Sequence, residues 1–220
     1  MKAQDAGELF DLYESDGTPL GRAKARALVH RDGDWHRSVH IWVWGVLGGA
    51  PYLVFQRRSA GKDTWPRALD VAVTGHVRAG ESVAQTLREA EEEIGLRVGP
   101  ADVVRLGLRR RSSRGAGVID NELQEIFAAV APVVIEGLRP SPAELEAILA
   151  VPFVEAETVL REGGEAVGLR LVVEGGGARL VEETIRGREL VPAGDGYYAK
   201  AYASLAVMLS GDRPEAWEIG

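Results

Sequence analysis

One segment, from Gly75 to Leu96, constrains the fold of this chain more than any other, because a loop bracketed by glycines leads directly into a glutamate-rich helix. Ser82 can cap this helix and Gly95 can end it. Apolar residues recur between the two at helical spacing, while the other face is crowded with glutamate. The sequence therefore predicts one helix over residues 82–94 with an apolar face and an acidic face.

The rest of the chain predicts strands, with one further well-marked helix near the C-terminus. Strands are expected over residues 8–13, 39–46, 52–56, 69–73, 103–108, 123–130, 153–154, 169–173 and 179–184, and helices over 140–149, 156–161 and 197–209. The glycine-rich segment 162–196 is interpreted as a β-hairpin, because its branched apolar residues need burial. The tail after Gly211 is expected to fray unless Trp217 anchors it.

Five arginines lie in or next to the stretch between two of these strands, residues 109–117. This stretch is expected to form a loop or hairpin tip, with most of its arginines in solvent and some at the rim of a pocket. They are Arg105, Arg109, Arg110, Arg111 and Arg114.

Composition narrows the function. The chain has 220 residues, 45% hydrophobic and 27% charged, which suits one domain with a sizeable core. No apolar run approaches the roughly 18 residues that cross a bilayer, and the N-terminus lacks a secretory apolar segment, so we expect a cytoplasmic protein. A net charge of −7 argues against bulk binding to nucleic acid. Because cysteine is absent, any metal must sit on carboxylates or histidines, and oxygen ligands favour Mg²⁺ or Mn²⁺.

Three glutamates of the acidic helix, Glu89, Glu92 and Glu93, lie within one turn on the same face. Like charges at this spacing repel by about a few tenths of a kcal/mol per pair, and a divalent cation between them removes the conflict. This arrangement predicts attack of water on a phosphorus, with the cation neutralising charge on the leaving phosphate. The alternative is a solvated acidic face, in which Arg88 simply pairs with Glu92.

The segment also resembles the Nudix box, whose pattern is glycine, five residues, glutamate, seven residues, Arg-Glu, two residues, Glu-Glu, one residue, glycine and an aliphatic residue. The matching residues are Gly75, Glu81, Arg88, Glu89, Glu92, Glu93, Gly95 and Leu96. Only six residues separate Glu81 from Arg88, one fewer than in the family. A residue lost within the helix would turn Glu81 by about 100° from the other glutamates, whereas one lost at its start would only tighten the entry.

The resemblance implies an α/β fold, the Nudix α/β/α sandwich with a mixed sheet, plus a C-terminal β-hairpin and helix. We expect an N-terminal strand and lead-in over residues 1–37, the Nudix core over 38–161, and the hairpin and helix packed on it over 162–220. The implied activity is a Mg²⁺- or Mn²⁺-dependent pyrophosphohydrolase that acts on a diphosphate linkage, in a nucleoside diphosphate derivative or a related phosphoanhydride.

The resemblance also implies roles for residues of the box. Glu89, Glu92 and Glu93 are expected to bind metal, and Arg88 to orient the neighbouring glutamates without binding metal itself. The supporting residues are Gly75, Glu81 and Gly95.

The flanking segments, over about residues 8–160, resemble the Nudix subgroup that includes isopentenyl-diphosphate isomerase. This likeness implies that Arg58 and Lys62 bind the substrate diphosphate, the alternative being ordinary surface cations. The histidines His30, His36 and His76 fall near positions where the isomerase binds its metal, and a structural role in the loops around the cleft is an equal alternative.

The isomerase likeness also implies a cysteine immediately before the Gly-His pair, and this chain has Thr74 there. A hydroxyl cannot easily replace a thiol as an acid or base near neutral pH, so we expect hydrolysis and keep isomerisation as the alternative. A non-catalytic Nudix-fold binding module is a further alternative, supported by the shortened box.

The general base is expected among Glu93, Glu122 and Glu125. Strand alternation puts Glu122 and Gln124 on one face and Glu125 on the other, and we favour Glu122. The expected partner is a small-molecule diphosphate, with no membrane, and the family likeness allows a homodimer through the C-terminal hairpin. The sequence does not identify the base of the substrate, because the five aromatic residues that could stack on it are each predicted to lie in the core instead: Trp35, Trp42, Trp44, Trp65 and Phe127.

Overall fold

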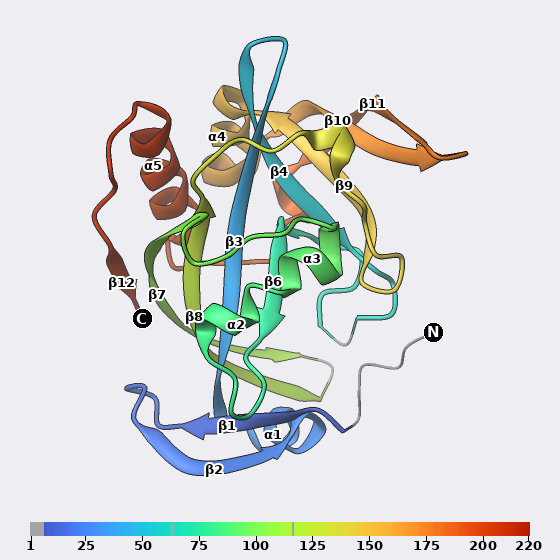
Figure 1. Ribbon diagram of the computed structural model, residues 1–220. Coiled ribbons are helices and arrows are strands. Elements are labelled where there is room, and N and C mark those ends of the chain that lie inside the picture. Colours follow the sequence, from blue (N-terminus) through green and yellow to red (C-terminus); the bar gives the residue numbers. More distant parts are fainter. Residues whose placement is uncertain (1–6, 63, 116) are drawn as a thin grey trace.

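A mixed β-sheet forms the centre of the computed structural model, which describes residues 7–62, 64–115 and 117–220. The main path of the sheet runs β11–β10–β9–β4–β3–β8–β7–β12 (Figure 1). Its strands are β3 (Trp35–Leu47), β4 (Ala50–Arg58), β7 (Val103–Gly115), β8 (Val118–Ala129), β9 (Leu145–Pro152), β10 (Glu165–Glu174), β11 (Gly177–Arg186) and β12 (Trp217–Ile219). β3 pairs in parallel with β8, and β12 with β7, whereas the other neighbours on this path are antiparallel.

Strand β3 changes partners along its length, and this positions the cavity described below. Its residues 43–47 pair with β4, whereas residues 38–41 pair with the short strand β6 (Val73–His76). β4 continues instead to pair with β5 (Leu69–Val71). Because β4 and β6 occupy successive stretches of the same edge of β3, they diverge, and the sheet opens between them.

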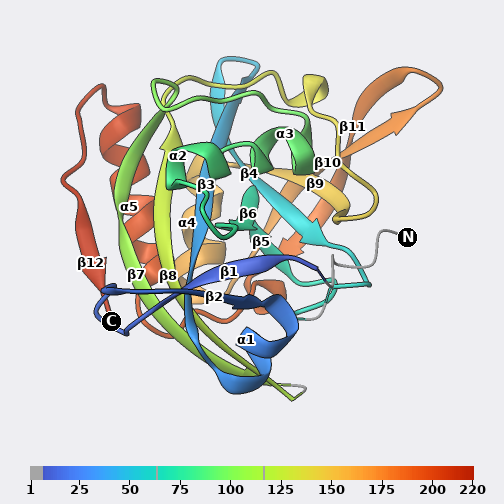
Figure 2. The same cartoon turned by 60° about the horizontal axis from the view of Figure 1, so that its bottom comes forward.

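Helices cover both faces of the sheet (Figures 1 and 2). Alternation along β3 sends Trp42 into a core with α4 (Phe153–Glu162) and α5 (Tyr197–Leu209), while Ile41 and Val43 enter a second core. This second core contains Ala90 and Ile94 of α3 (Glu89–Ile94) and Leu87 of the turn that joins α3 to α2 (Val83–Thr86). The predicted α/β/α sandwich with a mixed sheet is therefore confirmed.

A layer at the N-terminus closes one end of the molecule. The strands β1 (Leu9–Tyr13) and β2 (Pro19–Ala25) pair with each other, and α1 (Arg26–Asp32) follows directly. Phe10, Leu12 and Val29 form their own small buried cluster there. The sequence did not predict β2 or α1. Helix α1 matters for function because it carries His30 into the molecule.

Several predicted elements are wrong. Residues 145–152 form the strand β9 between β4 and β10, because this apolar run is buried on both faces of the sheet, and they do not continue a helix from residue 140. Residues 153 and 154 begin α4 and form no strand. The arginine-rich stretch extends β7 and β8 towards residue 116, which lies outside the described residues. Within this stretch Arg109 is buried, whereas most of these arginines were expected to lie in solvent.

The C-terminal predictions fare better. The hairpin β10–β11 and the helix α5 over residues 197–209 are confirmed. The tail is held, because β12 pairs with β7 and the Trp217 indole N–H donates to Ser204 Oγ at 3.0 Å. The division into segments 1–37, 38–161 and 162–220 stays a prediction. Among the described residues, no helix combines the length and the apolar character that crossing a membrane requires.

Candidate active site

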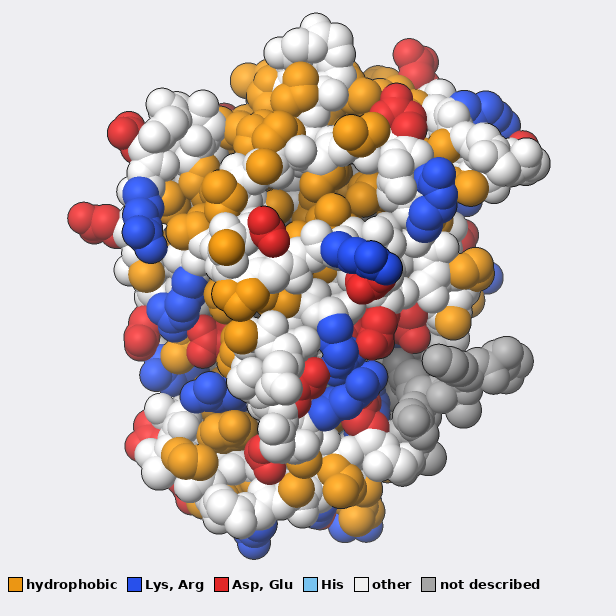
Figure 3. All heavy atoms as spheres, in the orientation of Figure 1, with side chains coloured by type: hydrophobic (Ala, Val, Ile, Leu, Met, Phe, Trp, Pro, Cys, Tyr) orange, Lys and Arg blue, Asp and Glu red, His pale blue; other side chains and the backbone are white. Residues whose placement is uncertain are grey.

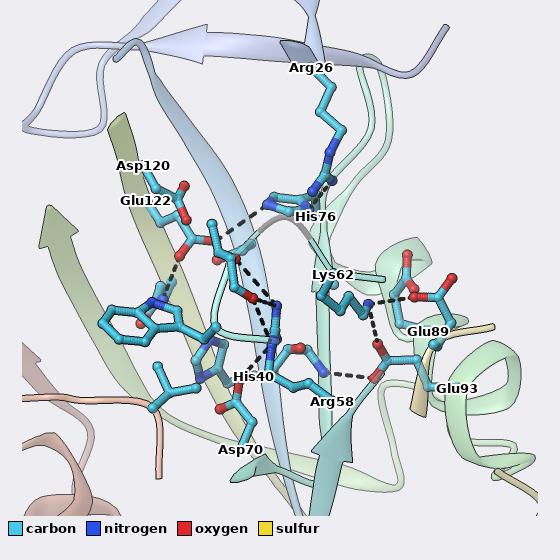
Figure 4. A pocket seen from close by; sticks show the side chains of 18 of the residues that line it. Arg26, His40, Arg58, Lys62, Asp70, His76, Glu89, Glu93, Asp120 and Glu122 are labelled. Atoms are coloured by element: carbon cyan, nitrogen blue, oxygen red, sulfur yellow. Dashed lines mark hydrogen bonds and ion pairs between the residues drawn. The ribbon is translucent and has the colours of Figure 1, made fainter. Parts of the chain in front are cut away.

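A cavity of about 800 Å³ opens where β4 and β6 diverge (Figure 4). The cavity is polar, and its lining side chains come from α1, β3, β4, β5, β6, α3, β7, β8 and the loops between them. Glu89 and Glu93 lie on one side of the close-up, Asp120 and Glu122 on the other, and Lys62 between them. On the outer face of the molecule, acidic and basic side chains gather around the middle, over α3, and hydrophobic ones above (Figure 3). The fold thus brings most of the predicted site residues to one place.

The acidic helix is interrupted, which corrects the prediction of one helix over residues 82–94. Ser82 caps α2 through a capping box with Gln85, and a turn at Leu87 and Arg88 separates α2 from α3. The interruption falls between Glu81 and Glu89, where the chain is one residue shorter than the Nudix pattern. The missing residue is therefore accommodated by a break in the helix.

Arg88 bridges this break. Its Nε donates to Glu81 Oε1 at 2.8 Å and its Nη2 to Glu81 Oε2 at 3.1 Å. Its Nη1 binds Glu89 and also lies 3.1 Å from Glu92 Oε2, so the ion pair expected of a solvated acidic face is present. Arg88 thus holds three glutamates, and Glu81 stays attached to the cluster despite the shorter spacing.

Glu93 is the most enclosed carboxylate of the box. It is 2% exposed, and its Oε2 accepts hydrogen bonds from the Thr74 backbone N–H at 3.0 Å and from Gln56 Nε2 at 3.2 Å. Burial raises its pKa to about 8, and burial also raises the pKa of Glu89 to about 7. Glu92, in contrast, is half exposed. A divalent cation would stabilise the ionised form of both buried carboxylates, so this donor set fits a metal.

The two box glycines have steric roles. A Cβ on Gly75 would lie 2.2 Å from Glu89 Cγ, so only glycine lets the Glu89 side chain lie against β6. Gly95 ends α3 with φ of 70°, and a Cβ there would lie 2.9 Å from Arg139 Cβ.

Facing the box is a cluster of four side chains that could hold a second metal: His30, His36, His76 and Asp120. One ligand atom of each lies within 4.8 Å of the others. His30 Nε2, His36 Nε2 and Asp120 Oδ1 are buried without a hydrogen-bond partner among the described residues. Buried polar atoms without partners are rare in native proteins, so a ligand is expected between them.

The protonation of these histidines suits a metal. Burial lowers the pKa of His30 to about 4 and holds the pKa values of His36 and His76 below their usual value, which leaves the rings neutral at pH 7. His36 Nδ1 donates to the Asp34 carbonyl at 3.2 Å, so its Nε2 keeps a free lone pair. The residues therefore fit metal ligation better than the alternative of structural hydrogen bonds.

Glu122 lies beside this cluster, with its Oε1 3.6 Å from His76 Nε2 and its Oε2 accepting a hydrogen bond from Gln124 Nε2 at 2.8 Å. Burial opposes ionisation of Glu122, but its pKa is lowered, with the charge of the facing Arg111 and the hydrogen bond from Gln124 among the causes. Glu125 points to the other face and pairs with Arg105 at 2.9 Å.

Arg58 and Lys62 both line the cavity and both are already paired. Arg58 Nη1 donates to Asp70 Oδ2 at 3.1 Å, and its Nη2 to the Thr64 carbonyl at 3.1 Å. Lys62 binds Glu144, and its Nζ lies 3.8 Å from Glu93 Oε1. Lys62 therefore lies beside Glu93 of the box, whereas Arg58 supports the loop that follows it.

Comparison with known proteins agrees with this geometry. The family model of the NUDIX domain matches residues 34–173. The chain belongs to the Nudix family. The fold is the Nudix fold, and the predicted enzyme class, a Nudix pyrophosphohydrolase acting on phosphoanhydride bonds, is confirmed with it.

Curated relatives give the same family. The chain is 29% identical over 194 residues to an uncharacterized Nudix hydrolase of Clostridium acetobutylicum, covering 87% of this chain and 93% of that protein. It is 33% identical over 161 residues to Nudix hydrolase 3 of Arabidopsis thaliana, covering 70% of this chain but only 20% of that much longer protein. A crystal structure of DR0079 from Deinococcus radiodurans aligns with a TM-score of 0.49 at 21% identity, covering 71% of this chain and 90% of that chain.

The predicted likeness to the isomerase subgroup is confirmed as well. The chain is 31% identical over 139 residues to an isopentenyl-diphosphate Delta-isomerase of Clavibacter sepedonicus, covering 63% of this chain and 70% of that one. In this Nudix protein Thr74 lies at the cavity, and its Oγ1 lies 3.3 Å from Gln56 Nε2. No thiol is available anywhere in the chain.

Among the aromatic residues, the core prediction is correct for Trp42 and wrong for Trp65, which is 39% exposed and lines the cavity.

Sequence reasoning also missed Asp120 as a partner of the histidines. Its position two residues before Glu122, on the same face of β8, was the available signal. It missed Arg26 too, whose Nη1 donates to His76 Nδ1 at 2.9 Å.

Proposed function

We propose that this chain is a divalent-cation-dependent hydrolase of a diphosphate linkage in a nucleoside diphosphate derivative or a related phosphoanhydride. The observation that carries the proposal is one polar cavity shared by the box glutamates, Lys62 and Glu122. Carboxylates for a cation, a positive charge for phosphate and a separate carboxylate for proton transfer are the parts that phosphoanhydride hydrolysis needs.

The cation sites follow from the donor sets. Glu89, Glu92 and Glu93 would hold Mg²⁺ or Mn²⁺ through oxygen atoms. The cluster of three histidines and Asp120 would hold a second cation, and its nitrogen donors favour a transition metal over Mg²⁺. When bound, such cations offset the charge of the diphosphate and of the leaving phosphate.

The chain's own residues complete the reaction. Lys62 exchanges its carboxylate partners for phosphate oxygens when substrate binds, with Arg58 adding positive charge at the same wall. Glu122 accepts a proton from water while the water oxygen forms a bond to phosphorus and the bond from phosphorus to the leaving phosphate breaks. Glu93 is the second candidate for this base, but it is assigned to the cation and its Oε2 already accepts two hydrogen bonds, which makes Glu122 the better one.

The test is phosphate release from a panel of nucleoside diphosphate compounds with Mg²⁺ or Mn²⁺, for the parent, Glu92→Gln and Glu93→Gln. We expect Glu93→Gln to lower kcat about 100-fold or more. Glu91→Gln is the matched control, because Glu91 lies on the same helix, is exposed and pairs with Arg97 instead. Full activity in Glu92→Gln and Glu93→Gln refutes the site, and no activity of the parent on any compound favours the binding module.

Isomerisation is not proposed, because Thr74 replaces the cysteine that the isomerase likeness requires. A cytoplasmic location and a homodimer stay predictions, which fractionation of the source cells and the mass of the purified protein in solution would test.

A further inference from the structure

The segment between the 3₁₀ turn at Gly187–Glu189 and α5, residues 191–197, lies against the site although it follows the matched Nudix region, which ends at residue 173. The Val191 N–H donates to the Leu69 carbonyl at 2.8 Å, which fixes the segment to β5. Val191 itself lines the cavity. The segment is therefore part of the cavity wall.

Asp195 in this segment neutralises a buried arginine. Its Oδ2 accepts from Arg109 Nε at 2.6 Å and its Oδ1 from Arg109 Nη2 at 3.1 Å, a two-bond pairing. Arg109 is 3% exposed, and its guanidinium lies 4.3 Å from the centre of the Tyr197 ring. A buried guanidinium needs a charged partner, so Asp195 fixes where Arg109 points.

Two further hydrogen bonds connect Arg109 to Glu122. Its Nη1 donates to Gln124 Oε1 at 3.0 Å, and Gln124 Nε2 donates to Glu122 Oε2 at 2.8 Å. Arg109 and Gln124 are direct partners across β7 and β8, and Gln124 is fully buried. Because the Gln124 oxygen is held by Arg109, its amide nitrogen can only face Glu122.

A second contact acts at the next position of the same strand pair. Arg111 is the β7 partner of Glu122, and its Nη2 donates to the Pro192 carbonyl at 3.0 Å. The 191–197 segment thus contacts the β7 residue opposite each of the two β8 residues in the chain of bonds.

We propose that Asp195 is a positioning residue for Glu122, acting through Arg109 and Gln124, so that the C-terminal addition sets the geometry of the candidate general base. This inference rests on the proposed function of Glu122. Asp195 is not among the residues that line the cavity, so its effect would reach the reaction through the direction of the Glu122 carboxylate.

The experiment compares kcat, KM and crystal structures of full-length variants. Asp195→Asn keeps the size and removes the charge, Asp195→Glu keeps the charge, and Gln124→Met cuts the chain of bonds next to Glu122. We expect kcat to fall about 10- to 100-fold in Asp195→Asn and Gln124→Met, the range for residues that orient a functional group, with KM nearly unchanged. Asp195→Glu should retain most of kcat, and the crystal structure of Asp195→Asn should show the Glu122 carboxylate turned from its present position.

Glu218→Gln is the matched control. Glu218 on β12 pairs with Arg110 at 3.3 Å, so its removal loosens another C-terminal contact with β7 that does not lead to Glu122. An equal loss of kcat in this control, or an unmoved Glu122 in Asp195→Asn, overturns the proposal. If Asp195→Asn does not fold, Gln124→Met decides. If the parent hydrolyses no compound, the proposed function fails, and the crystal structures alone decide the positioning role.

Discussion

His40 offers a sharp test of the electrostatics of this cavity. It lies on β3, and the Tyr197 hydroxyl oxygen is 3.0 Å from its Nδ1. That oxygen also accepts a hydrogen bond from the Trp42 indole N–H at 3.1 Å. The indole can only donate, so the tyrosine O–H is available to donate to an unprotonated Nδ1. Burial of His40 favours this neutral form.

The size of the effect follows from the pKa. Burial lowers the pKa of His40 to about 4, whereas the pKa of histidine in the unfolded chain is about 6.5. Between these pH values the unfolded state binds a proton that the folded state does not, so stability falls as pH falls. A difference of about 2.5 units corresponds to about 3 kcal/mol of unfolding free energy at pH 4, relative to pH 7.

The assay is urea unfolding followed by tryptophan fluorescence, with chelator present, at several pH values between about 4 and 7. His40→Asn keeps an acceptor for the Tyr197 hydroxyl but cannot titrate. Its stability relative to the parent should rise by about 3 kcal/mol as the pH is lowered across this window. Trp217→Phe is the control, because it removes the hydrogen bond to Ser204 and no titrating group, so its offset from the parent should not depend on pH. Parallel curves for His40→Asn and the parent would refute the reasoning.

Two further substitutions test single contacts. Gly75→Ala should displace Glu89 and weaken Mn²⁺ binding, measured by calorimetry, at a stability cost of about 1–3 kcal/mol. Gly115→Ala should bind Mn²⁺ normally, because the part of the chain that the structure describes has no atom within 4 Å of a Cβ there. Equal binding by both variants would exclude the steric role. Trp217→Ala should lower the unfolding free energy by about 2 kcal/mol, since the side chain is only partly buried. Trp217→Phe should lower it by about 1 kcal/mol, because this variant loses only the hydrogen bond to Ser204. A smaller loss in Trp217→Ala than in Trp217→Phe would contradict this.

The sequence predicted those parts of the molecule whose conformation depends on residues close together along the chain. The caps at Ser82 and Gly95 placed the outer ends of the acidic segment, and helical periodicity placed α5 with its correct bounds. The break at Leu87 and Arg88 could not be read from these signals, because the apolar positions on either side still fit one helical period. The prediction for residues 145–152 was wrong because their environment in the sheet, which the local sequence does not show, decides their structure. Their composition suits a helix, and only their place between β4 and β10 makes them a strand.

The residues of the candidate site also fall into those that the local sequence predicted and those that only the fold brings together. The box glutamates were found because one helix turn brings them together. The histidine cluster is formed by three segments that are distant along the chain. The sequence suggested its histidines only through the family likeness and missed Asp120. The pairing of Asp195 with Arg109 gave no signal, since the two residues are 86 positions apart, one in the segment interpreted as a C-terminal hairpin and one in the arginine-rich stretch. Charge pairing over such separations is decided by the fold.

That pairing also shows why the C-terminal addition and the Nudix core are hard to separate in physical terms. Tyr197 packs in the same core cluster as Trp42, and Asp195 neutralises Arg109 inside the sheet. Cutting the chain before residue 191 would leave a buried guanidinium beside Gln124 without its counter-charge and an indole N–H without its acceptor. Each defect costs on the order of 1–5 kcal/mol, a large share of the stability of a typical domain. The matched family region ends at residue 173, yet the structure that supports Glu122 continues to Tyr197.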